Sequence, residues 1–495
     1  MNKFNKEYFF KSKIGKFVFF LIISLISSIC FAQSAQENQA SSAYQYKRKI
    51  SSVFDYLQQN YIDEIDARVL YEGALKGMLD SLKDPYTVYL DPNTMRDLTD
   101  TTAGNFGGVG LSISKALESS SERPAYVEVA SPIEDTPGAK AGIQAGDYIT
   151  AIDGEATDPM TMEQVLNKLR GTVGTSVTVS ILRGNDIKFD VRLVRAIIEV
   201  PTVKFGMIGN IGYVRLIQFT PDTPKRLQEA LDSFAKSNFK SLIIDVRDNP
   251  GGLITSVADV ADKFIDSGTI VSTKSRLRFE NHVYMASKSK TTVPKNIPIV
   301  VLINRGSASA SEILAGALKD NHLAYLVGQQ TYGKGSVQQV IPLSNTDGFK
   351  ITMARYYTPS DTNIDKIGIP PDREILFPTL SEAEEKSYAD LIKKDEIRSY
   401  VENHKGMTES DIARYATTLQ KNYNLNESLL RRLIRLQVNR TKPSPLYDLD
   451  YDIQLAEALK ILRAEDFSSL VRQTKTLKEL QEIATSKNSV ASQQP

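Results

Sequence analysis

In 300-VVLINRGSASASEILAGALKD-320, the pattern of apolar residues predicts a strand that turns into a helix. Residues 300–303 form an uninterrupted apolar run, which is typical of a strand covered on both faces. Serines follow, and apolar side chains then recur at helical spacing from Ile313 onward. Similar apolar runs alternate with helix-like stretches from about residue 200 to residue 357. This alternation predicts an α/β core with a sheet between two helical layers.

The serines of this junction, Ser307, Ser309 and Ser311, allow two interpretations. From Ser309 to Glu312 the sequence is S-x-x-E, the capping box that begins many helices. A serine at a strand-to-helix turn is also exposed at a helix N-terminus, where the helix dipole stabilises developing negative charge. The junction alone therefore leaves a structural cap and a catalytic nucleophile both open.

A nucleophilic serine needs a base, and the chain contains three histidines. His322 follows Ser309 along the predicted helix at roughly 20 Å, given a rise of about 1.5 Å per residue. His282 lies in a polar stretch, and His404 lies in the helical tail. Their positions do not indicate a histidine-based triad.

Lys334 is the alternative base, set between glycines in the run 328-GQQTYGKGSVQQVIPL-343. On a strand, Lys334, Ser336 and Gln338 share a face, so the Gln338 amide could orient the amine. A base must be neutral, and lowering a lysine pKa from about 10.4 to about 7 costs roughly 4.6 kcal/mol. Burial can supply that shift. The alternative is an ordinary surface lysine in a glycine turn.

A third candidate element is 245-DVRDNPGGL-253, in which a glycine pair follows a buried strand. The turn at Gly251 and Gly252 can aim backbone N–H groups at an oxyanion. Loss of one such donor costs about 3–4 kcal/mol in other enzymes. An ordinary Pro-Gly turn is the alternative.

Over residues 104–197, the sequence pattern becomes one of glycine turns and short strands. They contain 104-GNFGGVGLSI-113, 141-AGIQAGDYITAIDG-154 and the alternating strand 175-TSVTVSILRGN-185, in that order. This ordered set resembles a PDZ domain. The resemblance implies that backbone N–H groups in the loop hold a peptide's terminal carboxylate while the adjoining strand edge pairs with the peptide. The loop residues are Gly107, Gly108, Val109 and Gly110. A structural turn in another β-domain is the alternative.

The order of all these motifs, between 84-DPYTVYL-90 and 368-GIPPD-372, is similar to that of the carboxyl-terminal processing peptidases, or tail-specific proteases. The resemblance covers about residues 51–372. It implies that Ser309 is the nucleophile, that Lys334 is the general base and that Gln338 orients the lysine.

The same resemblance implies further roles. An oxyanion hole would be formed by the Ala310 N–H and one N–H of the Gly251–Gly252 turn. Arg170, at the end of the helix of the PDZ-like domain, matches an arginine that couples peptide binding to activation in some family members. Ser307 and Ser311 are interpreted as turn and helix hydrogen-bonders.

The composition and the N-terminus limit the protein class. A net charge of +1, with 41% apolar and 24% charged residues, is that of a globular protein and argues against nucleic acid as a partner. Lysines precede an apolar run over residues 17–32, which is shorter than the ~20 residues that span a bilayer. This pattern predicts a cleaved signal peptide and export to the periplasm or cell envelope; an uncleaved membrane anchor is the alternative. Cys30 is the only cysteine, and the sequence has no cluster of cysteines and histidines, so a zinc site is not expected. The expected serine peptidase would use neither a metal nor an organic cofactor.

The sequence therefore predicts an α/β (α+β multidomain) protein with a PDZ-like domain inserted between a helical segment and the protease core. The expected segments are a signal peptide (1–32), an N-terminal helical segment (33–103), a PDZ-like domain (104–197), an α/β serine protease core (198–379) and a helical C-terminal region (380–495). The expected activity is that of a serine endopeptidase that binds protein C-terminal tails and cleaves through an acyl-enzyme. The alternative is a catalytically inactive envelope scaffold that binds tails. By analogy with relatives, a homodimer is expected, with a lipoprotein adaptor as a candidate partner.

Overall fold

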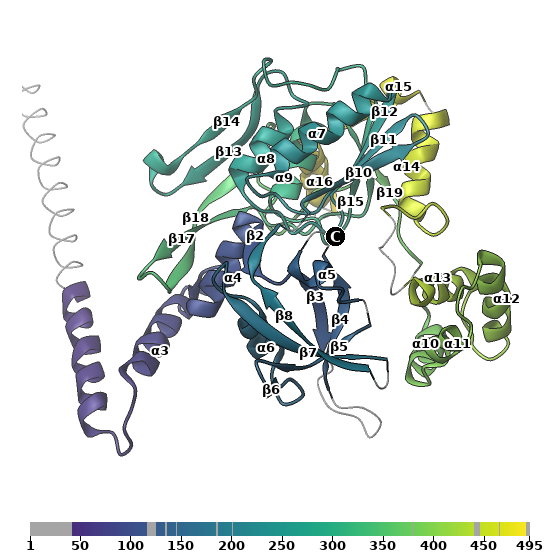
Figure 1. Cartoon of the computed structure of the whole chain (residues 1–495). Helices are drawn as coiled ribbons and strands as arrows, with labels where there is room; N and C mark the ends of the chain where they lie inside the picture. Colours follow the sequence, from purple (N-terminus) through teal and green to yellow (C-terminus); the bar gives the residue numbers. More distant parts are fainter. Residues whose placement is uncertain are drawn as a thin grey trace, which may run out of the picture. The chain divides into compact units, whose positions relative to one another are not determined.

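The computed structural model of the chain describes residues 42–115, 125–133, 136–144, 146–184, 187–199, 201–378, 380–439, 446–464 and 466–491 (Figure 1). The predicted signal segment, with Cys30, lies outside these residues. The chain divides into two compact units, Met1–Asp91 and Pro92–Pro495. Among the described helices, none combines the length and apolar composition that crossing a lipid bilayer requires.

The described part of the first unit is mainly helical. It contains a helix over residues 42–60, α3 (Ala67–Asp80) and the short strand β1 (Val88–Leu90). Asp66 caps α3, because its side chain accepts a hydrogen bond from the Arg68 N–H at 2.9 Å. The rings of Tyr71 and Tyr89 meet edge to face and join the helix to the strand.

The second unit begins with α4 (Pro92–Ala103) and continues into the PDZ-like domain. One antiparallel sheet of this domain has the order β3-β4-β5-β7-β8, with β6 (Glu155–Ala156) beside β5. Its strands are β3 (Leu111–Lys115), β4 (Val127–Pro132), β5 (Tyr148–Ile152), β7 (Ser176–Arg183) and β8 (Ile187–Val194). The helices are α5 (Pro137–Lys140) and α6 (Met162–Leu169), and apolar side chains alternate into a single core beneath them. A second ribbon pairs β2 (Asn105–Gly108) with β9 (Ala196–Glu199).

The α/β core is built on a sheet of order β10-β11-β12-β15-β16-β19, in which all neighbours after the β10–β11 pair are parallel. Its strands are β10 (Val203–Ile208), β11 (Ile211–Leu216), β12 (Ser241–Asp245), β15 (Ile299–Ile303), β16 (Tyr325–Gly328) and β19 (Arg373–Glu374). Every residue of β12 and β15 is buried, as expected for strands covered on both faces.

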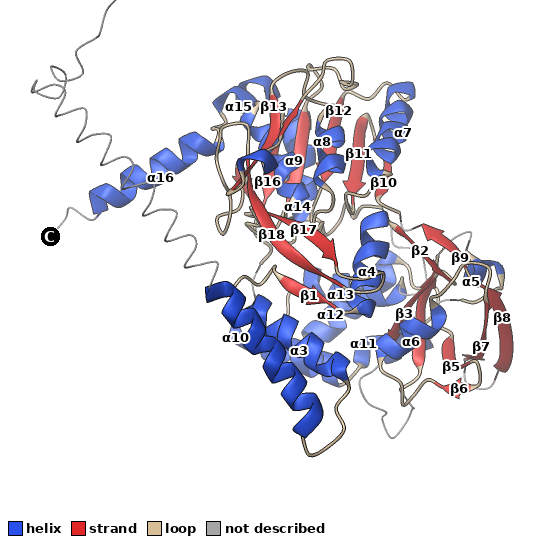
Figure 2. Cartoon of the chain, turned by 90° about the vertical axis from the view of Figure 1, so that its left-hand side faces the viewer, coloured by secondary structure: helices blue, strands red, loops and turns tan. Residues whose placement is uncertain are grey.

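Two helical layers cover this sheet. Helices α7 (Thr223–Lys236), α8 (Ile254–Ala261) and α9 (Ala310–Asp320) pack on one face, with Leu227, Val257 and Leu314 in the shared core (Figure 2). Helix α14 (Ile453–Ala464) packs on the other face through Leu455 and Ile461. Helix α14, which lies beyond residue 380, therefore covers the second face of the core sheet.

An antiparallel sheet flanks the core and carries Lys334 near one end. It includes β14 (Val283–Met285), β13 (Thr269–Ser275), β18 (Gly348–Tyr357) and β17 (Ser336–Pro342), in that order. The remaining helices are α10 (Glu382–Lys393), α11 (Glu396–Asn403), α12 (Glu409–Gln420), α13 (Glu427–Val438), α15 (Phe467–Gln473) and α16 (Leu477–Ala491). Helices α10 to α13 share an apolar cluster of their own. A capping box from Thr408 to Asp411 begins α12.

Candidate active site

Ser309 lies between β15 and α9 with an unusual backbone conformation. Its φ is +55° and its ψ is −113°, whereas N-cap residues normally have extended backbones. Positive φ is strained for a residue with a Cβ atom and persists only where the surroundings enforce it. A plain helix cap would not require such strain.

The other two serines of the junction hold it in place. The Ser307 hydroxyl donates to the Val246 carbonyl at 2.8 Å, and the Ser311 hydroxyl donates to the Asn249 carbonyl at 2.9 Å. Both serines are fully buried. The interpretation of Ser307 and Ser311 as structural hydrogen-bonders is confirmed, and both of them tie the serine turn to the segment that follows β12.

Glu312 joins the Ser309 turn to the Lys334 loop. Its Oε2 atom accepts hydrogen bonds from the Ser309 N–H at 2.9 Å and from the Lys334 N–H at 2.8 Å. Its Oε1 atom accepts from the Thr331 hydroxyl at 2.6 Å and from the Gly333 N–H at 2.7 Å. The carboxylate is fully buried, and this burial raises its pKa while the four hydrogen bonds oppose the rise. Sequence reasoning found Glu312 only as a capping-box residue.

Tyr356 forms a second bridge between the same two segments. Its hydroxyl hydrogen-bonds to the Lys334 carbonyl and lies 3.3 Å from the Ser309 carbonyl. The side chain is 1% exposed and comes from β18. Sequence reasoning missed Tyr356, since nothing in its apolar strand context distinguishes it from a core residue.

Lys334 is partly buried in the loop that precedes β17. Burial lowers the pKa of its amine, the positive charge of Lys350 lowers it further, and the Glu312 carboxylate opposes both effects. This environment differs from that of a solvated surface lysine. It favours the neutral amine that a base requires.

Gln338 lies on β17 beyond a β-bulge between Val337 and Gln338. Its amide nitrogen donates to the Ser336 hydroxyl at 2.8 Å and is 3.4 Å from the Thr352 hydroxyl. Ser336 and Gln338 therefore lie on one face, as expected for a strand. The two hydroxyls fix the orientation of the amide.

The glycine turn at 251–252 packs directly against Ser309. A Cβ atom on Gly251 would lie 2.8 Å from the Ser309 Cβ and 3.0 Å from the Ala310 nitrogen. The Gly251 N–H donates to the Asn249 side chain at 2.9 Å. Within the described part of the chain, the N–H groups of Gly252 and Ala310 have no hydrogen-bond acceptor. They are therefore the N–H groups that remain for an oxyanion.

The glycine loop of the PDZ-like domain is fixed by its carbonyl groups. The Val109 carbonyl accepts from the Gly138 N–H at 2.8 Å, and the Gly110 carbonyl accepts from the Ile133 N–H at 2.9 Å. Gly110 has a φ of +73°, and a Cβ there would lie 2.2 Å from the Thr136 side chain. Packing alone thus accounts for this glycine. The next strand, β3, is the outermost strand of its sheet, so one edge has no strand partner among the described residues.

The other two loop glycines belong to the β2–β9 ribbon. A Cβ on Gly107 would lie 2.3 Å from the Gly171 carbonyl oxygen, and one on Gly108 would lie 2.9 Å from the Phe106 ring. Both positions therefore also have a packing reason for glycine.

Arg170, directly after α6, contacts helix α4. Its guanidinium pairs with Asp97 and lies 3.6 Å from Asp100, and it stacks over the Phe106 ring with 4.8 Å between the charge centre and the ring centroid. Burial raises the pKa of Asp100, while Arg170 opposes the rise. Arg170 therefore holds the PDZ-like domain to α4.

Helix α4 also reaches the α/β core. The Gln218 amide donates to the Thr101 carbonyl at 3.0 Å. The next residue, Phe219, donates its N–H to the Gly251 carbonyl at 3.0 Å and accepts from the Leu253 N–H at 2.8 Å. Hydrogen bonds thus run from α4 to the glycine turn beside Ser309.

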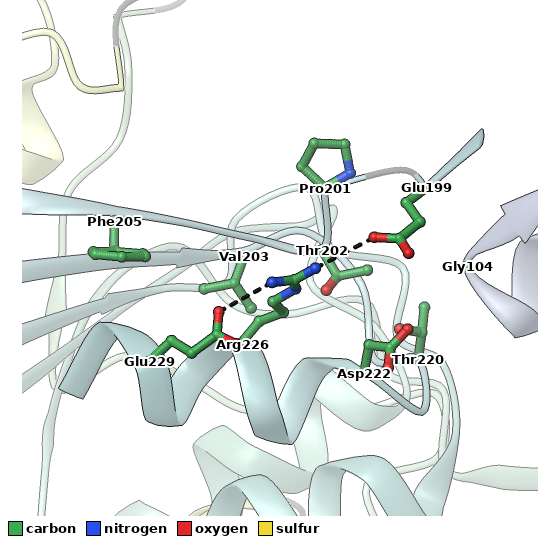
Figure 3. A pocket seen from close by; sticks show the side chains of 10 residues that line it. All are labelled: Gly104, Glu199, Pro201, Thr202, Val203, Phe205, Thr220, Asp222, Arg226 and Glu229. Carbon is green, nitrogen blue, oxygen red and sulfur yellow. Dashed lines mark hydrogen bonds and ion pairs between the residues drawn. The ribbon is translucent and has the colours of Figure 1, made fainter. Parts of the chain in front are cut away.

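A separate cavity of about 290 Å³ lies where the chain passes from β9 to β10. Figure 3 shows the Arg226 guanidinium between the carboxylates of Glu199 and Glu229, at 3.3 and 3.1 Å. All three side chains are largely exposed, so these ion pairs contribute little stability. Among the described residues, no cluster of His, Cys, Asp or Glu is placed to hold a metal ion.

Comparison with known proteins identifies the family. Three family models match the chain: peptidase family S41 over residues 210–375, a PDZ domain over residues 128–183, and the activating protease CtpB N-terminal domain over residues 15–94. A carboxy-terminal-processing protease of Bartonella bacilliformis is 40% identical, with 80% of this chain and 90% of the relative aligned. The chain belongs to the carboxy-terminal-processing proteases of peptidase family S41. The predicted family, fold class and serine-type peptidase activity are thereby confirmed.

Other members of the family are also similar. The carboxy-terminal processing protease CtpB of Bacillus subtilis is 32% identical, over 67% of this chain and 68% of the relative. Among solved structures, a photosystem II D1 C-terminal processing protease is 30% identical, with a TM-score of 0.40, and the match covers 66% of this chain and 92% of that chain.

Proposed function

We propose that this peptidase cleaves proteins with a Ser309/Lys334 dyad. The neutral Lys334 amine takes the hydroxyl proton as the Ser309 oxygen attacks the peptide carbonyl carbon. The protonated lysine then gives that proton to the leaving nitrogen, and water hydrolyses the acyl-enzyme in a second cycle of the same transfers. The observation that carries this proposal is the shared Glu312 oxygen, which accepts from the N–H groups of both residues.

The Ala310 N–H and the Gly252 N–H would stabilise the oxyanion that forms in each step. Gly251 would support the hole through its close packing on Ser309 rather than as a donor, because its own N–H is bound to Asn249. Gln338 would orient Lys334. Since its amide nitrogen faces two hydroxyls, its amide oxygen remains to accept from the lysine.

Protein substrates would be recognised by their C-terminal tails. The loop Gly107–Gly110 would hold the terminal carboxylate, and the open edge of β3 would pair with the tail as an added strand. Arg170 would couple this binding to the active site through α4 and Gln218, because these contacts continue to the Gly251–Gly252 turn.

The proposal includes the organisation and setting of the protein. The expected segments are a signal peptide (1–32), an N-terminal helical segment (33–103), a PDZ domain (104–197), a protease core (198–379) and a helical region (380–495). The protein would act after export, at the periplasm or cell envelope, as a homodimer, with a lipoprotein adaptor as a candidate partner.

The test uses the purified protein and an unfolded reporter that ends in an apolar tail, followed by intact-mass spectrometry. Ser309→Ala and a reporter with an amidated C-terminus run beside it. Cleavage that disappears with Ser309→Ala and slows strongly with the amidated tail supports the proposal. Tail binding without cleavage by the unmutated protein would contradict it and favour the inactive scaffold.

A further inference from the structure

Lys350 lies on the face of the β17–β18 hairpin that carries Gln338. In this antiparallel pair, Gln338 is opposite Thr352 and Val340 is opposite Lys350. Opposite residues project to the same face, and so do residues two positions apart on one strand. Lys350 is therefore the neighbour of both Gln338 and Thr352 on that face.

Hydrogen bonds join polar side chains along this face. The Gln338 amide nitrogen donates to the hydroxyls of Ser336 and Thr352, so the face extends from Lys350 to Ser336 at the start of β17. Ser336 is the first residue of β17, and Lys334 lies in the loop two residues before it. The face that carries Gln338 and Lys350 therefore begins beside the Lys334 loop, where the exposed Arg355 is opposite Ser336.

Two carboxylates lie near the Lys334 loop. The Glu312 carboxylate counteracts the lowering of the Lys334 pKa. Its two oxygens accept four hydrogen bonds, from Ser309, Thr331, Gly333 and the Lys334 backbone N–H. The Asp365 carboxylate accepts from the Gly335 N–H at 3.3 Å. In the part of the chain that the structure describes, no carboxylate forms an ion pair with Lys350.

We propose that Lys350 is a positioning residue whose fixed positive charge, on the same hairpin face as Gln338, keeps the Lys334 amine in the neutral form that accepts the Ser309 proton. This inference rests on the proposed dyad. Two ammonium groups that face one another destabilise each other's charged form, and the more buried one loses its proton first. The lowered pKa of Lys334, with Lys350 as its second cause after burial, agrees with this role.

The first test compares Lys350→Met with Lys350→Arg, which keeps the charge. Lys366→Met, at an exposed lysine near the site, controls for the loss of one positive charge. We expect Lys350→Met to move the pH profile of kcat/KM for the tail-bearing reporter to more alkaline pH. At pH 7 the activity falls about tenfold for each pH unit of that shift and recovers at high pH. Lys350→Arg and Lys366→Met should keep the wild-type profile.

The second test reads Lys334 without turnover. In the Ser309→Ala background, the rate at which acetic anhydride acetylates Lys334 is followed against pH by mass spectrometry. We expect the midpoint to rise when Lys350→Met is added. An unchanged midpoint and pH profile would overturn the role of Lys350, and so would a rise in KM alone at every pH, which would indicate a substrate contact. Full cleavage by Lys334→Ala would instead overturn the dyad, whatever Lys350 does.

Discussion

Ser309 and Lys334 donate their backbone N–H groups to the same oxygen of Glu312, at 2.9 and 2.8 Å. The relative position of the proposed nucleophile and base is therefore set by their backbones as well as by flexible side chains. Such preorganisation matters because a reacting group displaced by about 1 Å can lose on the order of a hundredfold in rate. The Tyr356 hydroxyl, which contacts both carbonyls, reinforces the arrangement.

Glu312→Gln tests this bridge. An amide has one acceptor oxygen, so some of the four donors lose their partner or face an N–H group. A buried unsatisfied donor costs about 1–3 kcal/mol, and we expect at least that loss in the free energy of unfolding in urea. We also expect a fall in kcat of roughly a hundredfold. Glu402→Gln, at an exposed helical position, is the matched control. Wild-type kcat in Glu312→Gln would rule out the bridge as a catalytic support.

The lowered pKa of Lys334 predicts two pH effects. Activity should rise as the lysine loses its proton, at a pH below the ordinary value of 10.5. The unfolding free energy, relative to Lys334→Met, should also rise between the lowered pKa and 10.5, because the unfolded chain still binds a proton that the folded chain has lost. Below the lowered pKa, the buried charge is a constant cost. A pH-independent difference between the two proteins in urea unfolding would contradict the lowered pKa.

Gly252→Ala tests the oxyanion turn. Gly252 has a φ of +143°, and a Cβ there would lie 2.1 Å from the Phe219 carbonyl oxygen, so the turn must move. We expect kcat to fall by about 10²–10³, as when an oxyanion donor is lost. Gly268→Ala is the control, since Gly268 also has positive φ but faces open space. Thermal unfolding of both variants distinguishes a displaced donor from a lost fold. A Gly252→Ala protein with the wild-type melting temperature and the wild-type kcat would contradict the role of this turn in the oxyanion hole.

Arg170→Ala and Gln218→Ala test the connection through α4. We expect each change alone to abolish the increase in cleavage rate that an apolar C-terminal tail gives, because α4 is proposed to couple tail binding to the active site. The double variant should then be no worse than either single variant, because both interrupt one path. Tail stimulation is measured as the ratio of kcat/KM for free and amidated reporters. Strictly additive losses would show that the two contacts act separately.

Local patterns in the sequence predicted much of this protein. The buried apolar runs of β12 and β15, the alternation in β7 and the motif order were sufficient for the family and the fold class. The shared face of Ser336 and Gln338 also followed from strand periodicity. These features depend on neighbours along the chain, so a sequence displays them directly.

Long-range partners were not predictable in the same way. The capping-box pattern located Glu312, but its contacts with Thr331 and Lys334 depend on how β16 and α9 pack. The positive φ of Ser309 is likewise imposed by surrounding structure. Helix α14 has an ordinary amphipathic sequence, and nothing in it indicates which sheet face it covers.

The residue that carries the acyl group of the acyl-enzyme tests the Ser309/Lys334 dyad directly. The protein is mixed with an excess of a tail-bearing peptide ester, quenched in acid within one turnover, digested and mapped by tandem mass spectrometry. The Ser309/Lys334 dyad predicts an acyl adduct on Ser309, no adduct in Ser309→Ala, and slow formation in Lys334→Ala at pH 7. An adduct on another residue, or one that forms at full rate without Lys334, would contradict the dyad.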